Sequence, residues 1–131
     1  MMLSEFTKEK FADLLNLIER LEEKDQYYTF YDLIYPLDRT EILSKHYSLI
    51  ERIFTSLLSR IENLDEKARY GMNDRYSSFY RLIYPVNGTE IFNKHRSLIE
   101  KKFTSLLSRI ENLDKRDQSY AFDDLNNALI G

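Results

Sequence analysis

The sequence predicts an all-α fold: an antiparallel up-down-up bundle of three long helices, or a helical array, whose middle helix is broken near residues 71–74. Two observations lead to this prediction. Residues 31–65 recur as residues 80–114, 49 positions later, with 26 of 35 residues identical. The chain also has only three glycines and two prolines, which favours few, long elements. We expect one helical domain over residues 1–131, with repeat units at about 4–36, 37–85 and 86–130.

The first unit is the most diverged copy, and it predicts a long first helix. Between residues 11 and 33 it matches residues 103 to 125 at an offset of 92, including Phe11, Leu15 and Ile18. These apolar residues are spaced by four and three positions, so they lie on one face of a helix. The unit has no capped start of its own.

The second and third units each begin with a helix-start pattern just after a Tyr-Pro pair. A proline disfavours helix in the residue before it, so the preceding helices should end at corners near residues 35–38 and 84–87. A short polar residue with a glutamate three positions later then forms the pattern of a capping box. The predicted N-cap and N3 residues are Asp38 with Glu41, and Asn87 with Glu90.

Apolar residues beyond these starts follow one helix face. At about 100° per residue, alternating steps of four and three positions stay within one narrow stripe. Such a stripe is the coiled-coil-like seam of helices that pack side by side. It comprises Ile50, Phe54, Leu57, Ile61 and Leu64 in the second unit, and Ile99, Phe103, Leu106, Ile110 and Leu113 in the third.

The second unit carries six extra residues around positions 65–74. Gly71 suits the position just after a helix end, and Asp74 suits the start of a new helix. We therefore expect the middle helix to break at this insertion.

Charge and composition exclude several classes of protein. The net charge is only -3, so electrostatics argues against nucleic acid or an anionic membrane as a partner. The absence of cysteine excludes disulfides, thiol nucleophiles and cysteine-ligated zinc. The first ten residues lack the apolar core of a signal peptide, and no apolar run approaches the roughly 20 residues of a membrane helix. We expect a soluble, cytoplasmic protein.

The two histidines do not indicate a catalytic or metal site. His46 and His95 occupy the same place in their units, near the apolar seam, where an imidazole packs at the edge of a core. A metal site would need carboxylates three or four residues away on the same face, and Glu41 and Glu51 stand five residues from His46. We expect no catalytic residue, no metal ligand and no cofactor.

One pattern supports an enzymatic alternative. Arg39 and His46, with six residues between them, loosely resemble the Arg-x(4–6)-His spacing of the helical HEPN ribonucleases. That spacing leaves open, as an alternative, a helical RNA-binding protein or HEPN-like ribonuclease that uses these two side chains. The third unit departs from the pattern, because Gly88 stands where Arg39 stands in the second.

Tyrosine clusters just before each Tyr-Pro corner are the strongest functional signal. A helix cannot point so many neighbouring rings inward, so some are either exposed or packed on a partner, and tyrosine is enriched at interface hot spots. The alternative is a tyrosine-rich end of the core whose hydroxyls reach water. The candidate partner-binding residues are Tyr27, Tyr28, Tyr31, Tyr35, Tyr76, Tyr80 and Tyr84.

These observations favour a non-catalytic helical module for protein-protein interaction. The best match is a small adaptor, or an inhibitor of the immunity or antagonist type, that binds one protein target through its tyrosine-rich helix ends. Self-assembly, as a homodimer or a structural protein, is a further alternative, because apolar surface left over by the helices can pair with a second copy.

Overall fold

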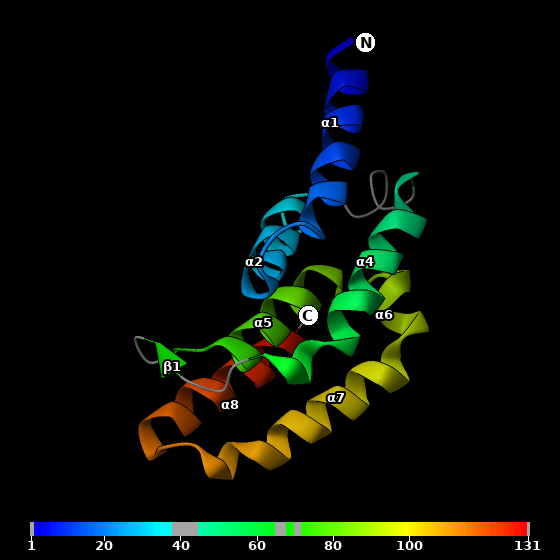
Figure 1. The fold of residues 1–131 in the computed structure, drawn as a ribbon. Helices are drawn as coiled ribbons and strands as arrows, with labels where there is room; N and C mark the ends of the chain where they lie inside the picture. The colour runs from blue at the N-terminus through cyan, green and yellow to red at the C-terminus, as the bar shows by residue number, and fades with distance from the viewer. Residues whose placement is uncertain (1, 38–44, 65–67, 70–71, 131) are drawn as a thin grey trace.

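The computed structural model describes residues 2–37, 45–64, 68–69 and 72–130 (Figure 1). Within them the regular secondary structure is helical apart from one short hairpin, which confirms the all-α prediction. The α-helices are α1 (Met2–Ile18), α2 (Glu23–Ile34), α4 (Tyr47–Ser59), α5 (Asp74–Ile83), α6 (Glu90–Lys94), α7 (Arg96–Arg109) and α8 (Lys115–Leu129). Three 3-10 turns, η1 (Ile61–Asn63), η2 (Tyr84–Val86) and η3 (Ile110–Asn112), and the strands β1 (Ala68–Arg69) and β2 (Met72–Asn73) complete the described elements.

The helices form an array of pairs. Figure 1 shows α1, α4 and α7 following one another along one side of the molecule, with α2, α5 and α8 beside them. The α5 helix lies between α2 and α8 and packs against both. The first and last of the described units therefore lie at opposite ends of the array.

The prediction of three long helices is wrong, because each helix divides into a pair. The chain leaves the α1 helix after Ile18, α4 after Ser59 and α7 after Arg109. Backbone at Leu64 and Leu113 is extended, with ψ of 153° and 160°, so no helix can continue through these leucines. Each unit consequently contains two helices that fold back on each other, which are α1 with α2, α4 with α5, and α7 with α8.

One side chain from the second helix of each pair fastens this corner. The side-chain amide of Gln26 donates to the carbonyl of Leu21 at 3.0 Å, and Gln118 donates to the carbonyl of Leu113 at 2.8 Å. In the middle unit Arg75 takes the same place and donates to the carbonyl of Leu64 at 2.9 Å. These bonds satisfy carbonyls that a helix end leaves without a partner. The corner therefore survives the six extra residues of the middle unit.

The Tyr-Pro corners lie where the sequence places them. The α2 helix ends at Ile34 and α5 ends at Ile83, each just before its Tyr-Pro pair. The cap that follows differs from our prediction, since the N-cap of α6 is Thr89, whose hydroxyl accepts from the Phe92 amide at 3.5 Å. Gly88, at φ 84°, turns the chain between Asn87 and this cap. Asp38 and Glu41 lie outside the described residues.

The break in the middle unit begins earlier than predicted, because α4 ends at Ser59 and the backbone is extended at Leu64, and the insertion adds a short hairpin after that corner. Strands β1 and β2 pair as an antiparallel hairpin, with Ala68 opposite Asn73 and Arg69 opposite Met72. The new helix α5 begins at Asp74, the residue predicted to start it. Gly71 lies outside the described residues.

The predicted seam is buried in the middle unit and only partly buried in the last. Ile50, Phe54, Leu57, Ile61 and Leu64 are all at most 5% exposed. In the third unit Ile99 and Leu106 are buried, whereas Phe103, Ile110 and Leu113 are half-buried. The difference arises because α6 and α7 cover the middle unit, while α7 stands at the end of the array.

Candidate interaction surface

Two of the predicted partner-binding tyrosines belong to the core. Tyr27 and Tyr76 are 1% and 0% exposed. Their hydroxyls donate to the backbone carbonyls of Leu57 and Leu106, at 2.6 and 3.1 Å. Burial raises the pKa of Tyr27 above its usual value. These two buried side chains offer no surface to a partner in this structure, because each hydroxyl finds its acceptor inside the protein.

Four of the other tyrosines form a closed cycle of rings. Along each helix, Tyr31 stacks on Tyr35 with ring centroids 5.0 Å apart, and Tyr80 stacks on Tyr84 at 5.2 Å. Between the helices, Tyr31 lies 6.1 Å from Tyr80 and Tyr35 lies 5.7 Å from Tyr84. We name these four residues the tyrosine cluster. The four separations lie within the range of favourable aromatic pairs.

The local sequence explains this arrangement. Residues four apart lie on the same face of a helix, so Tyr31 stands over Tyr35 and Tyr80 over Tyr84. Each ring also meets the ring 49 positions away, so α2 and α5 run in the same direction and in register at this point. The repeat thus brings two copies of one tyrosine pair face to face.

A cation lies beside the cluster and connects three helices. The Arg81 guanidinium of α5 lies 4.2 Å from the centroid of Tyr28 and 5.3 Å from that of Tyr31, both on α2. On α8, burial raises the pKa of Asp124 to about 6, while the nearby charge of Arg81 acts in the opposite direction. Burial, and then the neighbouring Tyr31, raises the pKa of Tyr80. The Tyr80 hydroxyl therefore stays protonated at ordinary pH, and one positive charge is packed against the rings of Tyr28 and Tyr31.

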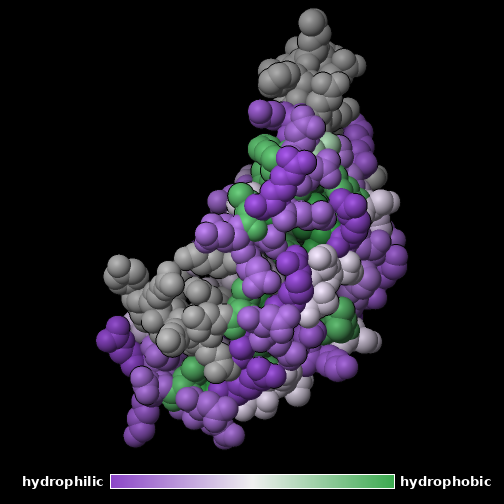
Figure 2. All heavy atoms as spheres, in the orientation of Figure 1, coloured by the Kyte–Doolittle hydropathy of each residue, from purple (hydrophilic) through white to green (hydrophobic). Residues whose placement is uncertain are grey.

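The cluster reaches the surface at one end. Tyr35 is 46% exposed, and Tyr28, Tyr31, Tyr80 and Tyr84 are half-buried. Figure 2 shows that the face turned to the viewer is mostly hydrophilic, with hydrophobic residues in separate patches. Half-buried rings held by their neighbours present aromatic surface with little freedom left to lose on binding.

The sequence predicts the tyrosines of this surface, but we did not expect Arg81 and Asp124 to lie beside them. A signal was present, because Asp32, Arg81 and Asp124 occupy one position of the three units and alternate in charge. The alternation predicts that these charges pair only if α2, α5 and α8 lie side by side. The sequence alone does not show that arrangement.

The histidines lie at the contacts between units. The His46 ring is 5.1 Å from that of Phe11, and the His95 ring is 6.2 Å from that of Phe54. His95 Nε2 is also 2.8 Å from Glu51 Oε2, which Lys94 Nζ approaches to 2.9 Å. Among the described residues no group of three His, Cys, Asp or Glu side chains is placed to hold a metal ion. Arg39, the other residue of the ribonuclease alternative, lies outside the described residues.

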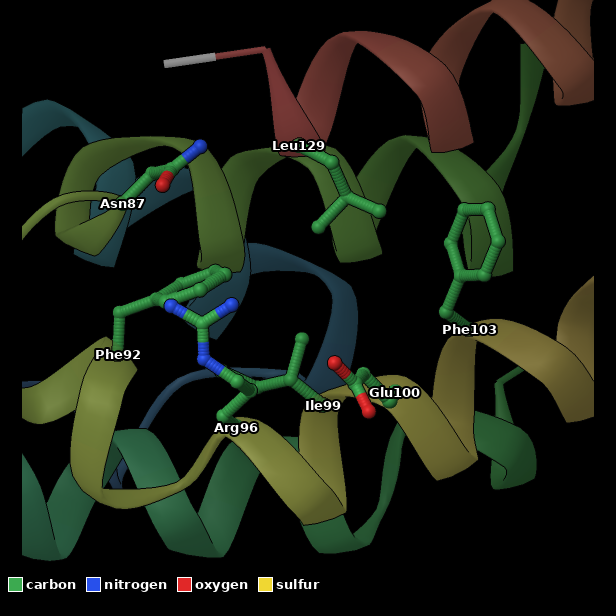
Figure 3. A pocket seen from close by; sticks show the side chains of 7 residues that line it. All are labelled: Asn87, Phe92, Arg96, Ile99, Glu100, Phe103 and Leu129. Atoms are coloured by element: carbon green, nitrogen blue, oxygen red, sulfur yellow. The ribbon is translucent and has the colours of Figure 1, made fainter.

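A hollow that the sequence does not predict lies at the end of the array. It has a volume of about 250 Å³ and opens between α6, α7 and the end of α8 (Figure 3). The Arg96 guanidinium lies over the Phe92 ring at 5.3 Å, with Leu129 facing them from α8. Asn87, Ile99, Glu100 and Phe103 complete its lining.

Comparison with known proteins assigns no family to this chain. No family model, curated protein or solved structure shows significant similarity to the chain. In the part of the chain that the structure describes, no helix combines the length and the apolar character needed to span a membrane. The described residues place the protein in the all-helical structural class.

Proposed function

We propose that this protein is a non-catalytic interaction module that binds a protein partner through the tyrosine cluster. The observation that carries the proposal is the closed cycle of Tyr31, Tyr35, Tyr80 and Tyr84, which gathers four rings at the C-terminal ends of α2 and α5. Tyrosine and arginine are the residues most enriched in binding hot spots, and Arg81 lies against this cluster.

The physical advantage of such a surface is preorganisation. A tyrosine ring offers a large contact area with a hydroxyl at its edge, and it has few rotatable bonds to immobilise. Stacking fixes those bonds before a partner arrives, which lowers the entropic cost of association. A small adaptor, or an inhibitor of the immunity or antagonist type, needs a rigid recognition surface of this kind.

The test compares the protein with a variant that loses the two outer rings. Wild-type protein and the Tyr35→Ala/Tyr84→Ala double variant are used as baits in the native host, and captured proteins are quantified by mass spectrometry. The control is Tyr120→Ala, because Tyr120 is 50% exposed but lies on α8, outside the cluster. We expect one protein to be captured by wild type and control and lost from the double variant.

Titration of that purified protein then measures the effect. Loss of two hot-spot rings should weaken binding by about 10- to 1000-fold, which corresponds to roughly 1.4 to 4 kcal/mol. A partner that binds the double variant and the wild type equally would refute the tyrosine cluster as the recognition surface. Binding of RNA that weakens steeply with added salt would instead support the nucleic-acid alternative.

A further inference from the structure

The last unit exposes apolar residues whose counterparts in the other two units are buried. Leu15 and Leu58 are both 0% exposed, but Leu107, at the same position of the repeat, is 39% exposed. A helical unit of this kind buries its forward face only when the next unit packs on it. The same contrast holds for two further sets, Phe11 and Phe54 against Phe103, and Ile18 and Ile61 against Ile110.

An aromatic contact that joins successive units also has no counterpart at the end of the last unit. Phe30 packs on Phe54 of the next unit with ring centroids 6.3 Å apart, and Phe79 packs on Phe103 at 6.3 Å. Phe122 occupies the corresponding position in the last unit and is 49% exposed. We define the C-terminal end face by Phe103, Leu107, Ile110, Glu111 and Phe122.

The first unit leaves the opposite face uncovered. Leu57 and Leu106 are 1% and 0% exposed because the preceding unit packs on them, through Tyr27 in the first case and Tyr76 in the second. Leu14, their counterpart, is only half-buried, and Leu17 is 46% exposed. We define the N-terminal end face by Lys10, Leu14 and Leu17.

The two end faces carry opposite charges, and these charges stand at repeat positions that form ion pairs between units within the chain. Lys102 of the third unit lies 3.5 Å from Glu62 of the second, and Arg52 of the second lies 3.5 Å from Glu19 of the first. Lys10 occupies the repeat position of Lys102, and Glu111 that of Glu62 and Glu19. Both Lys10 and Glu111 are exposed.

We infer that the chain self-associates head to tail, with the C-terminal end face of one copy packed on the N-terminal end face of the next. The contacts would be those that already join its own units: Leu107 and Phe122 covered by α1 of the second copy, and Glu111 beside its Lys10. The two faces lie at opposite ends of the array (Figure 1), so one chain cannot satisfy both by itself. A contact between two different faces generates a ring or an open filament.

One internal contact has no counterpart in this arrangement. Glu51 pairs with Lys94 and His95, and the first unit has Met2 and Leu3 at the positions of those two residues. The junction between copies therefore lacks the contacts that Glu51 makes with Lys94 and His95 between the second and third units. The inference does not depend on the tyrosine cluster, which lies between α2 and α5 within one chain.

The test measures mass in solution for two face variants, alone and mixed. Leu17→Asp places a charge on the N-terminal end face, and Leu107→Asp does so on the C-terminal end face. Sedimentation of wild type should show a mass that grows with concentration above the 15.8 kDa of one chain. Each variant alone should remain a monomer, while an equal mixture should form a species of twice that mass and nothing larger, because each partner supplies one intact face.

Controls separate this result from misfolding and from other modes of pairing. Ser48→Asp adds the same charge at an exposed position of α4 and should associate like wild type. Lys10→Glu, another exposed position, should weaken association by about two- to fivefold. Wild type that stays monomeric up to about 1 mM would overturn the inference. So would association of Leu17→Asp alone with loss in Leu107→Asp, since that pattern means two-fold pairing of the C-terminal end face.

Discussion

The Tyr27 hydroxyl donates a 2.6 Å hydrogen bond to the backbone carbonyl of Leu57, in the unit that follows it. The same bond recurs 49 residues later, from Tyr76 to Leu106 at 3.1 Å. Each donor lies on the second helix of one pair and each acceptor on the first helix of the next. A buried hydroxyl therefore holds each junction of the array.

Removing these hydroxyls should weaken the junctions measurably. Tyr27→Phe and Tyr76→Phe each keep the ring and lose one buried hydrogen bond, at an expected cost of about 0.5 to 1.5 kcal/mol in the free energy of unfolding. The Leu57 carbonyl still accepts from the Arg60 amide at 3.2 Å, so it is not left without a partner. Urea denaturation measures the change. Tyr120→Phe, at an exposed ring, is the control and should shift stability by less than about 0.5 kcal/mol.

Truncating the leucine at one repeat position should lower the free energy of unfolding much more in the middle unit than in the last unit. Leu58→Ala removes a fully buried side chain and should cost about 2 to 5 kcal/mol, because the surrounding core cannot close the cavity. Leu107→Ala acts on a side chain that is 39% exposed and should cost less than about 1 kcal/mol in the monomer. Equal losses in dilute solution, by urea denaturation, would contradict the assignment of α7 to the end of the array.

Asp124 should make stability fall as pH rises from 4 to 7. Its pKa is raised from 3.8 to about 6 in the folded state, mainly by burial. The neutral form is thus favoured by folding, and this contribution is complete below about pH 4 and lost as pH rises through 6. Asp124→Asn should therefore be more stable than wild type at pH 7, by about 1 to 3 kcal/mol, and equal to it near pH 4. Urea denaturation at several pH values checks this; a difference that does not change with pH would refute it.

Glu51 should have the opposite pH dependence. Hydrogen bonds from Lys94 and then His95 hold the pKa of its carboxyl below the usual 4.5. Its stabilisation is present above pH 4.5 and is lost as pH falls through the lower folded pKa. Glu51→Gln should cost less than about 1 kcal/mol at pH 6, because Lys94 is largely exposed. The cost should shrink as pH falls below 4.5, and Glu100→Gln, at the same position of the last unit, should cost less throughout.

Several features of the fold were predictable because they depend on near neighbours in the chain. The seam from Ile50 to Leu64 follows helical spacing, and the helix ends at Ile34 and Ile83 follow from the prolines behind them. The division of each long helix was not predicted, since Gln26, Arg75 and Gln118 fasten the corner through carbonyls five to eleven residues away. Neither glutamine nor arginine is a helix-breaking residue, so residue spacing alone does not predict that the long helices divide.

Part of the candidate site was predictable for a similar reason. Tyr31 and Tyr35 are neighbours on one helix face, and their repetition as Tyr80 and Tyr84 is visible in the sequence. The cycle of four rings requires α2 and α5 to lie side by side in register. Burial of Tyr27 and Tyr76 depends equally on that packing.

By itself, the sequence determined the helical class, the seam, the Tyr-Pro corners and the repeat, because local spacing and backbone preference specify them. Only the tertiary structure decided which identical residues are buried. Leu58 and Leu107 have the same neighbours in sequence, yet one is enclosed by the next unit and the other faces outward. Burial depends on what packs against a face, and that is a property of the array as a whole.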